Sequence, residues 1–346
     1  MLLENGVKVV KNILANLSQF LKLKLDECKY FVVRADKMKN LVLGLKRDKV
    51  SFSLHHELGG LSVAETKRPK QQSPKYERNV KRSSKWKVNK YAVAVIIGNK
   101  NYTDRTPQVE FSHNDADAIK EFVINKLGYR KGNIIDLRDA TQAQMMAIFG
   151  TKDSYEGKLF GWVRPGKSDV TVFYSGHGAP GLKDKRGYLL PVDADPNLVE
   201  INGYPVDVLY KNLAKIDAKS ITVYLDACFS GDSPKGMIVR ATSGISVVAK
   251  LPTKKARLTV LTAAQGDQFA SWDEDAKMGL FTKNLLVALN GAADRKDYGN
   301  GDGVVTVGEV QKYLDDEMSY QARRRYNRSQ KATVLGDSKT VLSRTR

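Results

Sequence analysis

The chain has 346 residues and a formal net charge of +19 at pH 7, from 57 Lys and Arg against 38 Asp and Glu. This length suffices to bury a full hydrophobic core in one large domain or two smaller ones, which excludes a stapled miniprotein. The two cysteines, Cys28 and Cys228, lie far apart without metal-ligand spacing, which argues against a disulfide framework or a zinc ribbon and favours a reducing compartment.

The positive charge could indicate an acidic partner, either nucleic acid or anionic lipid. Charged residues interrupt every apolar run within residues 1–30 before it reaches the length of a signal peptide or a membrane span. We therefore expect a soluble, cytoplasmic protein with no membrane span.

Residues 1–65 are predicted to form a small accessory region of unknown role. Apolar residues recur at helical spacing over 7–21, and two short apolar runs, 41–45 and 50–54, predict a β-hairpin. Residues 66–90 are predicted to form a basic linker, because residues 67–90 hold ten Lys or Arg and one acid. A solubilising tether, a nucleic-acid arm and a cleavage site all remain open for this linker.

Beyond residue 90, short β-branched runs alternate with helical stretches. Strands are predicted at 91–97, 133–137, 169–174, 220–225 and 258–261, and helices near 115–127, 141–149, 205–214 and 279–290. This alternation predicts βαβ crossovers and a three-layer α/β sandwich with a mostly parallel sheet. Ligand sites in such sheets lie at the carboxyl ends of the strands.

Two of these predicted strands end on residues that can carry chemistry. One leads into Ser175-Gly-His177-Gly and the other into Asp226-Ala-Cys228. A free cysteine is usually a small buried hydrophobe, and that interpretation suffices for Cys28. Cys228 precedes a turn-forming run that would expose it, and the imidazole of His177 titrates in the range needed to activate a thiol.

The glycines beside His177 predict a tight turn that lets a substrate backbone approach. The backbone amides of Gly178 and Cys228 could then supply an oxyanion hole. The other histidines, His55, His56 and His113, need only ordinary surface roles.

These motifs resemble the caspase-like cysteine peptidases, and among them the metacaspases and the bacterial caspase-like enzymes. The caspase signature is Q-A-C-[RQG]-G with a histidine about 50 residues upstream, and here the separation is 228 − 177 = 51. The similarity extends over about residues 90–340, through the segments 92–102, 261–267 and 279–282 and the Asn114-Asp115 dipeptide. It implies a caspase-like sandwich with a mostly parallel six-stranded sheet flanked by helices.

The resemblance also divides the peptidase domain, residues 91–340. The large-subunit part runs to about residue 233, a linker covers 234–257, and the small-subunit part covers 258–340. Relatives are often cut after the nucleophile's strand. Because the linker carries several Lys and Arg, an enzyme specific for basic residues could cut itself there or in the 67–90 segment, although a solvated loop is the alternative.

Asp226 stands where the caspase signature has glutamine, which changes the expected specificity. A carboxylate would repel the aspartate that caspases accept and would bind Lys or Arg. The resemblance to metacaspases implies a pocket of Asp115, Ser175 and Asp226, with Cys228 as nucleophile and His177 as acid and base. The structural alternative is that Asp115 is a helix N-cap and Asp226 a strand-end acceptor.

We therefore predict a cysteine endopeptidase that cleaves proteins or peptides after Arg or Lys, a reaction that requires no metal. Two other classes remain: a catalytically idle scaffold, and a nucleic-acid-binding module, for which no zinc-finger or RNA-binding motif is present.

Calcium is a further possibility that the sequence raises. Residues 298–309 resemble an EF-hand loop through Asn300, Asp302, Gly303 and Glu309, but Tyr298 occupies the first ligand position, where Asp is required. The loss of that carboxylate argues against tight binding. Asp193 and Asp195 are weaker candidate ligands.

Overall fold

A computed structural model describes residues 44–46, 49–51, 88–103, 106–229, 232–233, 236–237, 257–264, 268 and 270–345. The chain divides into two compact units, Met1–Lys70 and Gln71–Arg346. In the first unit, β1 (Gly44–Lys46) pairs antiparallel with β2 (Lys49–Ser51), as expected for the predicted hairpin. The predicted helix over 7–21, Cys28 and most of the basic linker lie outside the described residues.

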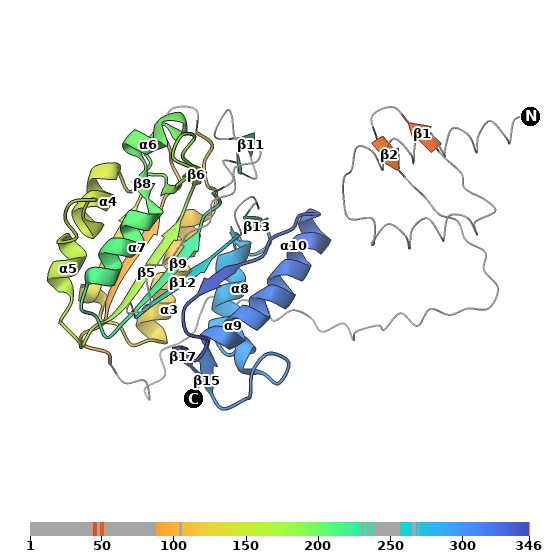
Figure 1. The fold of residues 1–346 in the computed structure, drawn as a ribbon. Coiled ribbons are helices and arrows are strands. Elements are labelled where there is room, and N and C mark those ends of the chain that lie inside the picture. Colours follow the sequence, from red (N-terminus) through yellow and green to blue (C-terminus); the bar gives the residue numbers. More distant parts are fainter. Residues whose placement is uncertain are drawn as a thin grey trace, which may run out of the picture. The chain divides into compact units, whose positions relative to one another are not determined.

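A six-stranded sheet forms the centre of the second unit, in the order β4, β3, β5, β9, β12, β16 (Figure 1). The strands are β3 (Val93–Gly98), β4 (Ile134–Arg138), β5 (Asp169–Ser175), β9 (Ser220–Asp226), β12 (Leu258–Thr262) and β16 (Thr333–Leu335). The first five pair in parallel, and β16 lies antiparallel to β12 at the edge. The predicted mostly parallel α/β sheet is confirmed, although the pattern located only the five parallel strands, since β16 is three residues long.

Helices cover both faces of this sheet. The main ones are α3 (Ser112–Asn125), α4 (Gln142–Phe149), α5 (Lys158–Trp162), α7 (Val206–Lys215), α8 (Leu280–Leu289), α9 (Val307–Tyr313) and α10 (Ser319–Tyr326). Single turns are α6 (Val199–Asn202), three 3₁₀ turns (Lys131–Asn133, Pro196–Leu198 and Ala292–Asp294), and a π-helical turn over Leu314–Met318.

Small antiparallel sheets complete the unit. They are formed by β6 (Gly178–Pro180), β7 (Gly187–Leu189) and β8 (Tyr204–Pro205); by β10 (Asp232–Ser233) and β11 (Gly236–Met237); by β13 (Trp272–Asp273) and β14 (Met278–Gly279); and by β15 (Val304–Thr306) and β17 (Val341–Arg344).

The two-residue period of a strand explains why both faces are buried. Along β3, Val93, Val95 and Ile97 pack with α4, α5 and α7, whereas Ala94 and Ile96 pack on the opposite face with α3 and α8. Figure 1 shows these two groups of helices on opposite sides of the sheet. The result is a three-layer sandwich in which each fully buried large side chain contributes about 1.5–3 kcal/mol.

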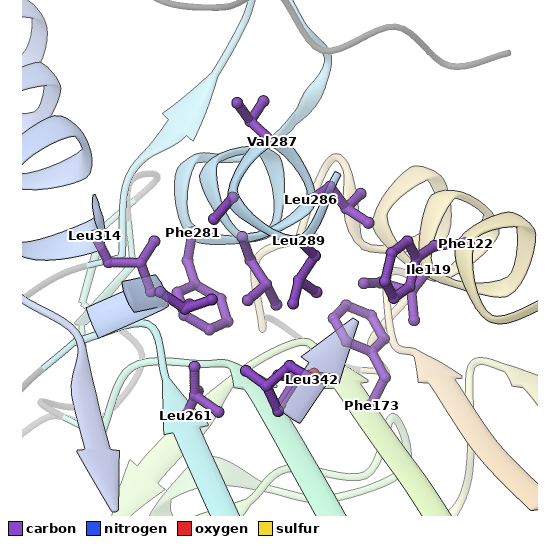
Figure 2. Close-up of a cluster of buried hydrophobic side chains, with 14 of the residues drawn as sticks. Ile119, Phe122, Phe173, Leu261, Phe281, Leu286, Val287, Leu289, Leu314 and Leu342 are labelled. Atoms are coloured by element: carbon purple, nitrogen blue, oxygen red, sulfur yellow. The ribbon is translucent and has the colours of Figure 1, made fainter. Parts of the chain in front are cut away.

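The core on the α8 side holds the beginning of α8 against the sheet. In Figure 2, Phe281 of α8 lies near Leu261 of β12, and Ile119 and Phe122 of α3 lie near Phe173 of β5. Gly279 and Thr282, on either side of Phe281 in the chain, donate to Asp115 and Asp226, so this packing positions those two contacts as well.

The register of the three central strands brings their last residues together. Gly98 of β3 pairs with Ser175 of β5, and Ser175 pairs with Asp226 of β9. The strand that follows β3 in the chain, β4, lies on one side of β3, and the next strand, β5, lies on its other side. The strand order therefore reverses between β3 and β5. Ligand sites in open α/β sheets occur at such a reversal, beyond the carboxyl ends of the strands.

Candidate active site

One pocket opens at this edge of the sheet, and five of the residues predicted from the sequence line it. They are Asp115, Ser175, His177, Asp226 and Cys228. The remaining lining residues are Val109, Gly176, Ala227, Ala270, Trp272 and Gly279. The structure thus gathers residues from β5, β9, α3 and the segment before α8 into one site.

His177, two residues after β5, is held at its backbone by two tyrosines. Its amide donates to the hydroxyl oxygen of Tyr102 at 2.7 Å, and its carbonyl accepts from the Tyr174 hydroxyl at 2.7 Å. The ring of Tyr102 also packs on the imidazole, with 4.7 Å between ring centroids. These contacts fix where the imidazole projects.

A third group orients the imidazole ring. His177 Nε2 lies 2.7 Å from the backbone carbonyl oxygen of Pro107. Because a carbonyl can only accept, we infer that the neutral ring carries its proton on Nε2 and leaves Nδ1 as the basic atom. Burial lowers the pKa of His177 to about 4, against the opposing effect of the Pro107 hydrogen bond. The ring is therefore a neutral base at physiological pH.

Cys228 lies two residues after the last residue of β9 and is a buried free thiol. Its Sγ accepts a hydrogen bond of 2.6 Å from the backbone amide of Ala270. A donor directed at the sulfur stabilises the negative charge of a thiolate. The donor to the sulfur therefore comes from a segment 42 residues later in the chain.

Gly178 lies directly against Cys228. A β-carbon at Gly178 would lie 2.5 Å from the Cys228 carbonyl oxygen and 2.8 Å from the ring of Phe229, so only glycine fits. The His177 carbonyl bonds to the Leu190 amide, and bonded and non-bonded positions alternate along an antiparallel ladder. The Gly178 amide is therefore directed away from β7, as an oxyanion donor requires.

The glycines beside His177 supply space in a different way from the one expected. Neither Gly176 nor Gly178 has a positive φ, so no left-handed turn is made here. A β-carbon at Gly176 would lie 2.7 Å from the hydroxyl oxygens of both Tyr102 and Tyr174. The space beside Gly176 is therefore occupied by the two hydroxyl groups that hold His177, and it is not left for a substrate backbone.

Two buried carboxylates form the floor of the pocket. Asp115 accepts from the Ser175 hydroxyl at 2.9 Å and from the Gly279 amide at 2.9 Å. Asp226 accepts from the amide and the hydroxyl of Thr282, at 3.1 and 2.6 Å. Both carboxylates border Gly279, since a β-carbon there would meet oxygens of both.

The alternative that Asp115 is a helix N-cap is wrong. The N-cap of α3 is Phe111, without a side-chain cap, and Asp115 lies inside the first turn of the helix. Asp226 does act as an acceptor at the end of its strand, as the structural alternative for that residue supposed.

Both carboxylates have raised pKa values. Burial is the largest cause for each, and the nearby charge of Asp226 adds to the shift for Asp115. The pKa of Asp226 rises from 3.8 to about 6, in spite of the two hydrogen bonds from Thr282. Among the ion pairs of the described residues, none involves either carboxylate. The pocket floor thus holds negative charge without a cation.

Sequence reasoning missed several residues of this site. Tyr102, Gly279 and Thr282 stood inside the segments that carried the family resemblance, but no role was assigned to them. Pro107 and Ala270 act through backbone atoms, so their side chains gave no signal.

The other candidate residues have structural partners. His113 Nε2 lies 3.0 Å from Asp139, Asp193 accepts from the Gln142 amide, and Asp195 caps a 3₁₀ turn.

Within the part of the chain that is described, no three His, Cys, Asp or Glu residues gather as metal ligands. No helix of that part is long and apolar enough to cross a membrane.

Comparison with known proteins gives the following similarities. A family model described as the caspase domain matches residues 91–331. Metacaspase-1 of Eremothecium gossypii is 28% identical over 193 residues, which cover 51% of this chain and 42% of the relative, so the chain matches less than half of that protein's length.

Two solved structures are also similar. Caspase-1 from Spodoptera frugiperda has a TM-score of 0.48 at 13% identity, covering 79% of this chain and 94% of that one. Protein GSU0716 from Geobacter sulfurreducens has a TM-score of 0.47 at 16% identity, covering 71% and 94%.

The buried carboxylates predict a pH-dependent stability. Because the folded-state pKa of Asp226 is raised, this carboxyl destabilises the fold above about pH 6, and the penalty disappears as the pH falls below its unfolded-state value. We expect Asp226→Asn to be more stable than wild type at about pH 7, by about 1–3 kcal/mol, and equally stable at about pH 4. Urea unfolding at both pH values measures this, with the exposed Asp153→Asn as the matched control. A variant less stable at neutral pH would contradict the prediction.

Proposed function

The chain belongs to the caspase-domain family of cysteine peptidases, and on that premise we propose that it is an endopeptidase that cleaves proteins or peptides after Arg or Lys through Cys228 and His177. The observation that carries the proposed specificity is the pair of buried carboxylates, Asp115 and Asp226, which lie beside the thiol and form no ion pair within the described residues. The cytoplasmic location expected from the sequence stays a prediction.

In the proposed acylation step, the Cys228 thiol gives its proton to Nδ1 of His177 and the sulfur attacks the substrate carbonyl carbon. The Pro107 carbonyl supports this assignment because it keeps the other ring nitrogen as a donor. The developing oxyanion would accept from the amides of Gly178 and Cys228. When the carbon–nitrogen bond breaks, His177 returns the proton to the leaving amine.

Deacylation reverses these roles. His177 takes a proton from water as the oxygen attacks the thioester carbon, and the carbon–sulfur bond breaks to release the carboxylic acid product. His177 then returns its proton to the sulfur, which regenerates the thiol and the neutral imidazole. Each step balances without a redox partner.

The specificity follows from the charge on the pocket floor. A guanidinium or ammonium group would replace the missing cation, and Arg can donate to two carboxylates at once because its donors form a planar fork. Ser175 and Thr282 support the proposal because their hydrogen bonds hold the carboxylates in place. An aspartate side chain would add further negative charge to the same pocket.

Reporter peptides ending in Arg, Lys or Asp test this function. We expect turnover of the Arg and Lys peptides only, no turnover by Cys228→Ala, and a kcat/KM for Arg lowered on the order of 10²-fold by Asp226→Asn. For wild type, kcat/KM for Arg should fall as the pH drops below about 6, because protonation of Asp226 removes charge from the pocket. Asp153→Asn is the matched control. Preference for the Asp peptide would refute the specificity, and a thiol inert to alkylation would favour an idle scaffold.

The contacts of Tyr102 predict a second effect on catalysis. Tyr102→Phe removes the hydroxyl that accepts the His177 amide but keeps the ring. Since a buried amide is then unsatisfied, we expect kcat to fall about tenfold with KM unchanged. Tyr210→Phe is a matched control, because the Tyr210 hydroxyl is buried without a hydrogen-bond partner. Equal kinetics for both variants would show that the Tyr102 hydroxyl does not position His177.

Self-processing is the regulatory part of the proposal. The basic residues of 234–257, most of which lie outside the described residues, and those of the 67–90 segment are the candidate cleavage sites. Intact mass and amino-terminal sequencing of purified wild type should reveal fragments that begin after Lys or Arg. The Cys228→Ala protein should remain whole, and fragments that persist in this variant would exclude self-cleavage.

A further inference from the structure

The loop that follows α8 is the EF-hand-like segment of the sequence, and its first ligand position does not face the loop. The Tyr298 hydroxyl donates to Glu317 at 2.9 Å and lies 3.3 Å from Asp316, and its ring packs on Tyr313. Tyr313 is the last residue of α9, and Asp316 and Glu317 belong to the π-helical turn that follows it. The Tyr298 side chain is therefore bonded to residues outside the loop, and it does not supply the carboxylate that the first ligand position requires.

Asp294 supplies the carboxylate that Tyr298 lacks. Its Oδ2 accepts from the amide of Gly303, the glycine at the sharp turn of the loop, at 2.9 Å. Its backbone carbonyl accepts from Gly301 at 2.7 Å, so the carboxyl group lies against the inside of the turn. Asp294 precedes the expected first position, residue 298, by four residues. The chain therefore has four more residues between Asp294 and Asn300 than an EF-hand loop has between its first and third ligands, and we refer to residues 295–298 as the insertion.

The second oxygen of this carboxylate is unusual. Asp294 is 7% exposed, and its Oδ1 is buried without a hydrogen-bond partner among the described residues. Since both oxygens belong to one carboxyl group whose Oδ2 contacts Gly303, Oδ1 also lies at the loop. A buried carboxylate oxygen without a partner is costly, which points to a missing ligand.

Glu309, at the twelfth position, approaches the same loop from the other side. It is 8% exposed and accepts from the amides of Asn300 and Thr306, at 3.3 and 2.9 Å. A β-carbon on Gly299 would lie 2.5 Å from Glu309 Oε1 and 2.7 Å from the Cα of Asp294, so both acids border this glycine. Neither acid takes part in an ion pair found among the described residues.

We propose that the loop of residues 294–309 binds one divalent cation, with calcium preferred, and that Asp294 serves as its first ligand. Glu309 provides the second carboxylate. The side chains of Asn300 and Asp302 and the backbone carbonyl of Val304 provide the remaining oxygens, because these are the third, fifth and seventh positions of the loop.

The ligand set explains the choice of calcium. Calcium accepts six to eight oxygens in flexible geometry, whereas magnesium requires a near-ideal octahedron. The oxygens of Asn300 and Asp302 now accept the amides of Asp302 and Val304, and each keeps a further lone pair for a cation. The set thus combines three carboxylates, from Asp294, Asp302 and Glu309, with the uncharged oxygens of Asn300 and Val304. Because no three acids gather as metal ligands in the described chain, ion binding would draw Asp302 toward the other two.

The site is separate from the proposed chemistry. The loop follows the carboxyl end of α8, whereas Thr282 and Gly279 of the pocket lie at the amino end of that helix. The cation would neutralise two buried carboxylates and hold β15 and α9 in place. Its effect is therefore on stability, and it can be tested whether or not the chain is a peptidase.

The full-length chain, stripped with EDTA, provides the test. We expect terbium to bind with luminescence sensitised by Tyr298 and Tyr313, calcium to displace it, and calcium to raise the melting temperature. Asp294→Asn keeps an acceptor for Gly303 but loses the charge, so it should weaken calcium binding roughly tenfold or more and abolish the thermal shift. Asp297→Asn, an exposed acid of the same insertion, should behave as wild type.

Several outcomes would overturn the proposal: no calcium-dependent shift in wild type, an unchanged affinity in Asp294→Asn, or equal displacement of terbium by magnesium. Without calcium, Asp294→Asn should melt no lower than wild type, which separates loss of binding from misfolding. Glu309→Gln offers a second variant, because glutamine preserves the capping box with Thr306 while removing the charge. It should also lose the calcium response.

Discussion

The pairing of β5 with β9 through their last residues is the constraint on which the site depends. Because Ser175 and Asp226 are register partners, each strand delivers its next residues, His177 and Cys228, to the same edge. Packing of both sheet faces against helices fixes this register, since a shift by one residue would exchange the side chains that each helix layer contacts. The geometry of the site is thus determined by the core beneath it.

That arrangement brings two carboxylates together under the pocket, which opposes folding. Burial raises both pKa values, the charge of Asp226 adds to the shift of Asp115, and the hydrogen bonds from Ser175 and Thr282 only partly offset this cost. The loop after α8 repeats the pattern, with Asp294 and Glu309 buried without an ion pair in the described chain. In both places the fold holds acidic groups that a cation would neutralise, and we propose a substrate side chain for the first place and a metal ion for the second.

Elements with a strong local pattern could be predicted from the sequence, and contacts between distant segments could not. The five parallel strands and four long helices follow from β-branched runs and helical spacing. The edge strand β16 was missed because three residues carry no period. The Pro107 carbonyl and the Ala270 amide were missed because any residue offers the same backbone atoms.

By itself, the sequence determined the α/β class and the identity of the chemical groups, because strand ends carrying His177 and Cys228 must meet at one edge of a parallel sheet. Only the tertiary structure decided what surrounds those groups. Burial and hydrogen-bond partners depend on segments far apart in the chain, such as Gly279 between the two carboxylates. The same reason applies to calcium: the sequence showed Tyr298 in the first ligand position, and only the folded loop brings the Asp294 carboxylate to Gly303.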